Sequence, residues 1–383
     1  MENRKVLNVG IDLGTSRSVI ASDNGIRTFL ASYAGYPKDA VSSKMLGKEI
    51  VFGEEALKNR LALHLYRPFD KGVILHSDTA EKHPEEHEKA KEVSKELLKK
   101  LVSFAAEEEE TEDLIIRGVV GAPALASINN KKDLLAIAEG VLDDVMIASE
   151  PFTVAYGLNI FTNSLIIDIG AGTVDLCRMG GTIPTEEDQI TTFKAGDHVD
   201  QVFLDLIKKK YKEANFTVTM VKRFKEENAF ISKHGERVLI ELPVHGKPSS
   251  HDVTDELRAA CRTIVPEIVE GVRKLIAAFD PEFQDQMKRN VILAGGGSQI
   301  IGLQREIQDY MKKTLGYGKV TRVEEPLYAG ANGALMLCKD MPDEYWDEVK
   351  SHGKKVALSV PNWKAASTRE GEPGFKIVTN SQI

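Results

Sequence analysis

The chain has 383 residues, of which 42% are hydrophobic and 28% are charged, as in a soluble globular protein. This length allows two domains of ordinary size, and a net charge of −8 argues against non-specific binding of nucleic acid, which requires a basic face. No apolar run approaches the ~20 residues of a transmembrane segment. Residues 1–5 lead directly into a strand without the apolar core of a signal peptide, so a cytoplasmic protein is expected.

The first predicted elements form a β-meander. An apolar strand over residues 6–11 ends at Asp12, and a turn of Gly14, Thr15 and Ser16 follows. Two further strands, 18–22 and 26–30, are joined by Asp-Asn-Gly, which is a strong hairpin signal.

The next segments alternate between helices and strands. Apolar residues at three- and four-residue steps predict an amphipathic helix over 84–106. An acidic run over 107–113 is interpreted as a solvated loop. His83 and His87 are four residues apart, but they lie among Glu and Lys on a helix expected to be solvated. The remaining predicted elements of this part are a strand at 115–123, a helix at 127–139, a strand at 144–148 and a helix at 151–158.

A second strand–Asp–Gly turn follows at Leu165–Thr173. Its apolar strand ends at Asp168, and Gly170, Ala171, Gly172 and Thr173 come next. Such a turn brings backbone N–H groups close to a ligand, and an Asp at a strand end can bind Mg²⁺ through water. A single Gly-x-Gly turn is equally well explained as a tight hairpin. The repetition of the pattern favours two similar domains that bind one polyphosphate.

The rest of the chain contains a third strand followed by glycines, at residues 290–298. Helices are predicted over 199–211 and 218–230, a strand over 238–242, and a helical segment over 254–279 that Pro266 should kink or divide. Further helices should begin at 303 and near 326, and the last ~40 residues lack clear periodicity, which suggests a partly ordered tail. Cys177, Cys261 and Cys338 are scattered and odd in number, which suits reduced, buried thiols.

Five segments in this order resemble the motif signature of the ATPase superfamily that contains actin, the heat-shock chaperones and the sugar kinases. They are the Asp12 turn, the 119–140 strand-turn-helix, the Asp168 turn, the Gly295-Gly296-Gly297 loop and the helix start at 326–337. Within that superfamily the chain is most similar to the bacterial actins that organise magnetosomes, in the runs 10–16, 35–39, 149–152, 168–173 and 294–298. The acidic stretch near 82–112 and the long C-terminal tail fit the family pattern less well.

The resemblance implies an α/β, actin-like ATPase fold of two similar domains, each a mixed sheet flanked by helices, with the nucleotide in the cleft between them. The first domain would span 1–160, the second 161–338 with its last helix returning to the first, and 339–383 would be a C-terminal extension.

The resemblance also assigns roles in binding ATP and Mg²⁺. Asp12 and Asp168 would hold the hydrated Mg²⁺, and Asp168 would also act in catalysis with Glu150, which would polarise the attacking water. The phosphates would lie against Gly14, Thr15, Ser16, Gly170, Ala171, Gly172 and Thr173. The ribose and adenine would lie against Gly196, Lys225, Glu226, Gly295, Gly296 and Gly297. Without the resemblance, Glu150 could be only a carboxylate stabilised by the dipole of its helix, and Lys225 and Glu226 only a surface pair.

The function implied is a cytoskeletal filament whose assembly depends on ATP, with copies of the chain itself and magnetosome-associated adaptor proteins as partners. Plasmid segregation and cell shape are alternative filament roles. A soluble small-molecule kinase would require a substrate pocket with a carboxylate base, and a chaperone would require a separate β-rich domain, for which too little chain follows residue 338.

Overall fold

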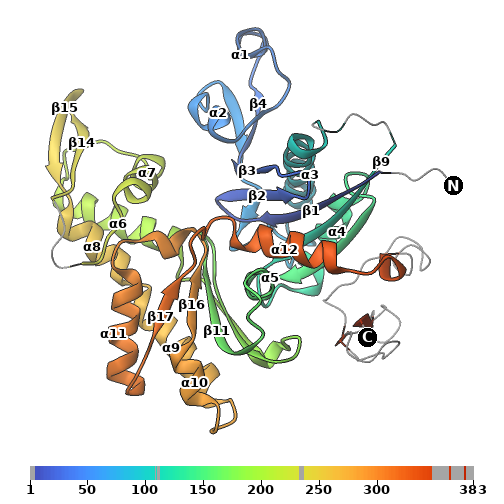
Figure 1. Ribbon diagram of the computed structural model, residues 1–383. Coiled ribbons are helices and arrows are strands. Elements are labelled where there is room, and N and C mark those ends of the chain that lie inside the picture. Colours follow the sequence, from blue (N-terminus) through green and yellow to red (C-terminus); the bar gives the residue numbers. More distant parts are fainter. Residues whose placement is uncertain are drawn as a thin grey trace. The chain divides into compact units, whose positions relative to one another are not determined.

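The computed structural model describes residues 5–107, 109, 113–232 and 237–346, with two short paired strands, β18 (Asn362–Trp363) and β19 (Phe375–Lys376). Most of the predicted C-terminal extension therefore lies outside the described residues. The chain divides into two compact units (Figure 1). The first comprises Met1–Thr162, Met179–Glu187 and Leu327–Ile383, and the second comprises Asn163–Arg178 and Asp188–Pro326. No described helix is both long enough and apolar enough to cross a membrane.

The first unit is built on a five-stranded sheet in the order β10-β9-β1-β2-β3. The strands are β1 (Lys5–Leu13), β2 (Arg17–Ser22), β3 (Arg27–Ala31), β9 (Leu114–Ala122) and β10 (Asp144–Ser149). Neighbouring strands are antiparallel from β1 to β3 and parallel from β1 to β10. The predicted meander and its hairpin turn, where Gly25 has φ 94°, are confirmed.

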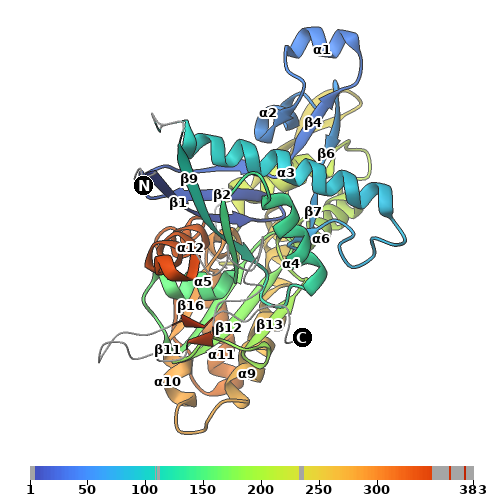
Figure 2. The same ribbon diagram turned by 90° about the vertical axis from the view of Figure 1, so that its right-hand side faces the viewer.

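Side-chain alternation along β1 gives the sheet two different faces. Leu7, Val9 and Ile11 pack with α3 (Pro84–Ala106) and α4 (Ile128–Ala138) into one apolar core. On the opposite face lie α5 (Glu150–Gly157) and α12 (Ala329–Asp340), as Figure 2 shows. Here a Cβ on Gly10 would overlap the backbone of α12, so this close packing of helix on strand requires glycine.

The helix predicted over 84–106 is confirmed as α3, but the expectation that His87 is solvated is wrong. His87 is buried, with Nδ1 3.0 Å from the Leu75 carbonyl oxygen and Nε2 3.3 Å from Asp133 Oδ2. The partners come from the loop before α3 and from α4, so the helical spacing could not reveal them. His83 is exposed, as expected.

A smaller part of the first unit extends beyond its sheet (Figure 1). It contains a three-stranded sheet in the order β5-β4-β6 and a β-hairpin. Its elements are β4 (Ala34–Pro37), α1 (Ala40–Leu46), β5 (Val51–Phe52), α2 (Gly53–Lys58), β6 (Leu63–Tyr66), β7 (Phe69–Asp70) and β8 (Val73–Ile74).

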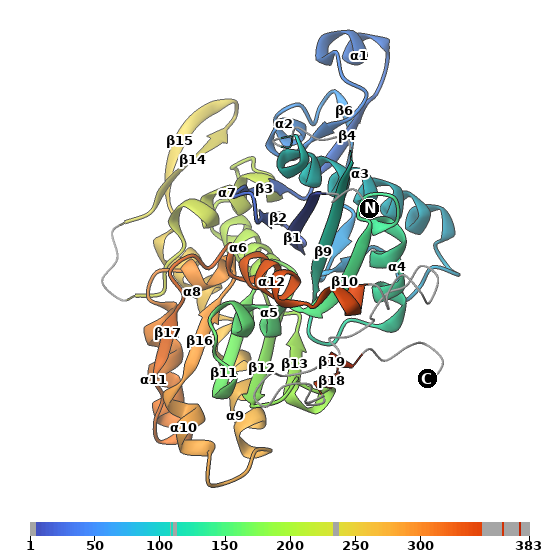
Figure 3. The same cartoon turned by 45° about the vertical axis from the view of Figure 1, so that its right-hand side comes forward.

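The second unit is built on a sheet in the order β13-β12-β11-β16-β17 (Figure 3). The strands are β11 (Thr162–Ile169), β12 (Val174–Gly180), β13 (Gln189–Thr192), β16 (Val291–Ala294) and β17 (Val320–Arg322). A 3₁₀ turn, η2 (Gly296–Gln299), follows β16, and another, η1 (Glu186–Asp188), lies before β13 where the chain passes between the two units. Strands β11, β16 and β17 are parallel, whereas β12 and β13 are antiparallel.

Helices of the second unit pack on its sheet around Leu165 and Ile167 in a single large core. They are α6 (Gly196–Lys210), α7 (Val218–Asn228), α8 (Thr254–Arg262), α9 (Val265–Ala277), α10 (Gln284–Arg289) and α11 (Leu303–Leu315). The predicted helical segment over 254–279 is divided into α8 and α9, and Pro266 lies in the first turn of α9, where its missing N–H costs nothing.

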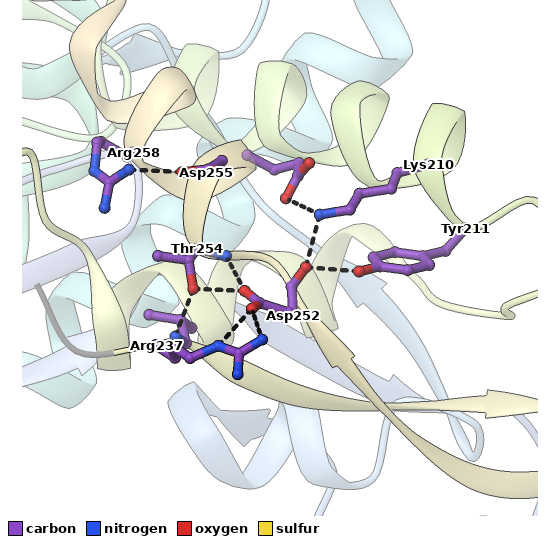
Figure 4. Close-up of polar contacts among 9 residues, drawn as sticks. Lys210, Tyr211, Arg237, Asp252, Thr254, Asp255 and Arg258 are labelled. Atoms are coloured by element: carbon purple, nitrogen blue, oxygen red, sulfur yellow. Dashed lines mark hydrogen bonds and ion pairs between the residues drawn. The ribbon is translucent and has the colours of Figure 1, made fainter.

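The hairpin of β14 (Leu239–Val244) and β15 (Lys247–Asp252) is fixed at its base by Asp252 (Figure 4). Oδ1 of Asp252 accepts hydrogen bonds from the Thr254 hydroxyl (2.6 Å) and backbone N–H (3.1 Å), and Oδ2 accepts from Arg237 Nε at 2.9 Å. These contacts, those of Thr254 first, lower the pKa of Asp252 to about 2. The backbone carbonyl of Asp252 also accepts from Lys210 Nζ and the Tyr211 hydroxyl, at 2.9 and 2.6 Å.

Replacement of Asp252 by Asn should therefore destabilise the protein in a pH-dependent way. The folded-state pKa of Asp252 is about 2, below the ~3.9 of an unfolded chain. The ionised Asp252 side chain therefore contributes fully to the free energy of unfolding at pH values above its unfolded-state pKa. This contribution is lost as the pH falls toward about 2. Urea unfolding at pH 7 and at pH values below ~4 should show a difference between wild type and variant that narrows on acidification. Asp255→Asn is the control, because the Asp255 side chain is 83% exposed and should contribute little; a pH-independent difference would contradict the assignment.

Candidate functional site

The first group of predicted site residues lies in the first unit, where Asp12 is the last residue but one of β1. In the sheet, Asp12 is paired with Gly121 of β9, and a Cβ on Gly330 at the start of α12 would be 3.4 Å from Asp12 Oδ2. The carboxylate therefore points to the face of the sheet that carries α5 and α12. This position follows from the alternation along β1, since Leu13 and Ile11 face the other core.

Glu150 lies beside Asp12 on the same face. It is the first residue of α5 and directly follows β10, which is two strands from β1 in the sheet. A Cβ on Gly121 would be 3.2 Å from Glu150 Cγ and 3.9 Å from Asp12 Cα, so Gly121 separates the two acidic residues. The Glu150 carbonyl accepts a hydrogen bond from the buried Thr153 hydroxyl at 2.7 Å, which fixes the first turn of the helix.

The turn of Gly14, Thr15 and Ser16 is held by residues that the sequence did not indicate. The Gly14 carbonyl accepts from the Ser32 hydroxyl at 2.6 Å, and the Ser16 carbonyl accepts from the Ser32 backbone N–H at 2.9 Å. The Thr15 carbonyl accepts from Arg67 Nε at 3.1 Å, so all three carbonyls are engaged within the protein. This arrangement suits a turn that presents N–H groups, and not carbonyls, to an anion.

The Thr15 side chain is also engaged. Its hydroxyl accepts a hydrogen bond from the Gly72 backbone N–H at 2.7 Å, and the residue is buried. Gly72 lies in the turn between β7 and β8, far from Thr15 in sequence. Thr15 thus ties the turn to this hairpin, which is a structural role added to the predicted one.

The second group lies in the second unit, where the buried Asp168 is the last residue but one of β11. The turn that follows is closed by a hydrogen bond from the Gly170 N–H to the Thr173 carbonyl at 2.9 Å. The start of α6 packs against this turn, because the N–H groups of Gly196 and Asp197 donate to the carbonyls of Gly170 and Ala171, at 3.1 and 2.7 Å. Gly172 lies within the same turn, and Thr173 is buried.

Lys225 is a buried residue that joins α7 to the start of α6. Its Nζ donates to the Gly196 carbonyl at 2.9 Å and forms an ion pair with Asp200 Oδ1, also at 2.9 Å. Burial raises the pKa of Asp200, while the positive charge of Lys225 opposes this shift. The interpretation of Lys225 as part of a plain surface pair does not hold, although its neighbour Glu226 is exposed.

The three glycines after β16 lie beside the Asp168 strand end, because Asp168 pairs with Ala294 in the sheet. Gly295 has φ 74°, and a Cβ there would overlap Asp168 Oδ1, so this position requires glycine on two counts. A Cβ on Gly296 would meet no atom within 4 Å, which leaves space for a ligand on that side of the loop.

The structure thus gathers the predicted residues into two groups, one in each unit. The first contains Asp12, Gly14, Thr15, Ser16 and Glu150. The second contains Asp168, Gly170, Ala171, Gly172, Thr173, Gly196, Lys225, Glu226, Gly295, Gly296 and Gly297. Each group joins a strand-end carboxylate to a hydrogen-bonded glycine turn, which offers oxygen ligands for a hard cation and N–H donors for phosphate oxygens. The donors are oxygens and not sulfur or imidazole, a set that fits Mg²⁺.

Comparison with known proteins places this architecture among actin-like proteins. The chain matches the MreB/Mbl protein family over residues 6–344. It is 37% identical over 338 residues to the actin-like protein MamK of Magnetospirillum gryphiswaldense, covering 88% of this chain and 90% of that protein. It resembles the structure of a MamK double helical filament with a TM-score of 0.81 and 36% identity, over 88% of this chain and all of the other. The fold predicted from the sequence is confirmed by this likeness.

A further similar structure contains a nucleotide analogue. It is a non-polymerising MamK mutant bound to AMPPNP, which is 36% identical, with a TM-score of 0.65, over 88% of this chain and all of that chain.

Proposed function

The chain belongs to the MreB/Mbl protein family, and we propose that it is a bacterial actin-like ATPase that polymerises into cytoskeletal filaments. The main support for this proposal is the 36% identity to the MamK filament protein over its whole length. The geometry adds that both units carry a strand-end Asp followed by a glycine turn. These two features together favour a nucleotide-dependent filament over a nucleotide-binding enzyme alone.

In this proposal each group supplies ligands for Mg-ATP. Asp12 and Asp168 hold the hydrated Mg²⁺, which neutralises part of the phosphate charge when bound. The N–H groups of the turns at Gly14–Ser16 and Gly170–Thr173 donate to the β- and γ-phosphates. Gly295, Gly296 and Gly297 line the adenosine on one side, and Gly196 and Glu226 line it on the other. The ammonium of Lys225 acts through the Gly196 carbonyl, to which it donates at 2.9 Å.

Hydrolysis is assigned to Glu150 with Asp168. Glu150 begins α5 beside Asp12, so its carboxylate can orient a water for in-line attack on the γ-phosphate and accept its proton. ATP binding favours contacts between copies of the chain, and hydrolysis weakens them, so that the nucleotide controls polymer stability.

The particular role proposed for the filament is to align and position magnetosomes in the cytoplasm, as the similarity to MamK implies. Adaptor proteins on the magnetosome membrane would then be partners. Plasmid segregation and cell shape are the competing filament roles, and imaging of a labelled chain with magnetosomes in its own cell separates them: alignment along the magnetosome chain is expected, and a distribution independent of magnetosomes would overturn the role.

Polymerisation is tested by sedimentation of the purified chain with Mg-ATP, with ATP and EDTA, and without nucleotide. Protein should pellet with Mg-ATP only, and the pellet should contain filaments in electron micrographs. A chain that binds and hydrolyses ATP but stays in the supernatant at all concentrations would contradict the filament and favour a small-molecule kinase of the same superfamily.

A further inference from the structure

A separate group of potential metal ligands lies where the chain enters α3, in the first unit. His76 is on the loop between β8 and α3, His83 is the residue before the helix, and Glu86 is in its first turn. His76 Nε2 is 2.9 Å from Glu86 Oε2, and His83 Nδ1 is 3.4 Å from the same oxygen. One potential ligand atom from each side chain lies within 4.8 Å of the other two.

These separations are comparable to the distances between the ligand atoms of a tetrahedral metal site. With metal–ligand bonds of 2.0–2.2 Å, neighbouring ligand atoms of tetrahedral Zn²⁺ lie about 3.3–3.6 Å apart. The distance from His83 Nδ1 to Glu86 Oε2, 3.4 Å, falls in this range, and the distance from His76 Nε2 to the same oxygen, 2.9 Å, is shorter. The imidazole rings of His76 and His83 stack at 4.1 Å with an interplanar angle of 18°, so one ring has to rotate for both nitrogens to point at one ion. His83 and Glu86 are exposed, so their side chains can adjust to a bound ion.

The loop holds His76 in place for binding. The Thr79 N–H donates to the His76 carbonyl at 2.9 Å, and the His83 N–H donates to the Thr79 carbonyl at 3.2 Å. His76 Nδ1 is 3.2 Å from the Thr79 hydroxyl. When Nδ1 carries the proton and donates to this hydroxyl, the lone pair of Nε2, which faces Glu86 Oε2, can bind a metal, and such outer hydrogen bonds are typical of metal-binding histidines.

The surroundings of the three side chains limit the number of protein ligands, and the ligand types determine which metal ion would be preferred. His87 is not available as a fourth ligand, because both its ring nitrogens face the Leu75 carbonyl and Asp133. The positive end of the α3 dipole disfavours a cation here, but the first turn carries both Glu85 and Glu86, which offset it. Two imidazoles and one carboxylate select a transition metal such as Zn²⁺ over Mg²⁺ or Ca²⁺, which prefer oxygen ligands.

We propose that His76, His83 and Glu86 bind one divalent transition-metal ion of the Zn²⁺ class, with water in the remaining position. Such an ion would fasten the loop after β8 to the first turn of α3. This site is distinct from the proposed nucleotide site, since none of its ligands belongs to either group described above.

The test uses the full chain, freed of metal with a chelator and kept without nucleotide, titrated with Zn²⁺ alone against a chromophoric competitor. His76→Asn is the main variant, because His76 has φ 65° and Asn tolerates this conformation. His76→Asn, His83→Ala and Glu86→Gln should each weaken Zn²⁺ binding at least ~10-fold, since loss of a residue that only hydrogen-bonds to a metal ligand already costs ~10–100-fold. Thr79→Val removes such a residue, the hydroxyl that contacts His76 Nδ1, and should weaken Zn²⁺ binding less than the ligand variants do.

A second readout separates metal binding from a structural effect of the substitutions. Zn²⁺ at 100 times its wild-type dissociation constant should shift the apparent unfolding constant of the wild type by about 100-fold and that of His76→Asn by about 10-fold or less. His64→Asn is the control, because His64 is an exposed histidine on β6 outside the cluster and should behave as wild type. Equal Zn²⁺ affinity in wild type, His76→Asn and Glu86→Gln, or no saturable binding to the wild type, would overturn the proposal.

Discussion

Asp12→Ala and Asp168→Ala should each weaken Mg-ATP binding by about 10–100-fold, the effect of losing an interaction with a charged group worth ~1.5–3 kcal/mol, and should abolish hydrolysis. Each carboxylate ends a strand beside a glycine turn, and Asp168 is buried against Gly295. Without this anchor, the triphosphate charge is poorly neutralised in the protein. Titration with a fluorescent ATP analogue at fixed Mg²⁺ measures the change.

The same titration with EDTA distinguishes a metal anchor from a general loss of the site. In the absence of Mg²⁺ a carboxylate only repels the phosphates, so its removal should leave ATP affinity unchanged or slightly improved. Asp205→Ala is the control, because Asp205 is exposed on α6, where its Oδ1 accepts a hydrogen bond from Gln201 Nε2 at 3.0 Å. Unchanged Mg-ATP affinity in both variants, or an equal loss with and without Mg²⁺, would contradict the assignment of the Mg²⁺ site.

The parts of the fold that could be predicted are those fixed by local pattern. The Asp-Asn-Gly hairpin, the helix over 84–106 and the break at Pro266 each depend on residues within one turn or one helix face. The strand–Asp–Gly turns were recognisable for the same reason, because strand, carboxylate and glycines are consecutive. The repetition of this pattern also predicts two similar units.

The supports of the candidate site could not be predicted, because they come from distant parts of the chain. Ser32 and Gly72 hold the turn at Gly14–Ser16 through contacts with no sequence signature of their own. Lys225 and Glu226 are neighbours on a predicted helix, and the sequence does not show which of them is buried. Only Lys225 is buried, and there it forms an ion pair with Asp200. The burial of His87 could not be predicted for the same reason, since one of its partners, Asp133, lies on α4.

Glu150→Gln should reduce ATP hydrolysis at least ~100-fold while ATP binding and polymerisation are kept. The side chain keeps its shape beside Gly121, so the packing at the start of α5 is preserved. The amide cannot accept a proton from water, and groups in this role typically contribute 10²–10⁴ in rate, or roughly 3–5 kcal/mol of barrier. Glu150→Ala should have a similar effect on the rate. Phosphate release and pelleting are measured on the same sample.

The joint measurement separates a catalytic from a structural role for Glu150. If hydrolysis weakens the filament, Glu150→Gln filaments should persist after wild-type filaments have disassembled, because the switch to the ADP state is blocked. Glu88→Gln serves as the control, since Glu88 pairs with Lys91 on the exposed side of α3 and should change neither quantity. Wild-type hydrolysis in Glu150→Gln would exclude Glu150 as the catalytic group. If Glu150→Gln binds ATP normally but forms no polymer, the carboxylate is needed for assembly before any hydrolysis takes place. Glu150 would then act through the structure of α5 and not as the catalytic group.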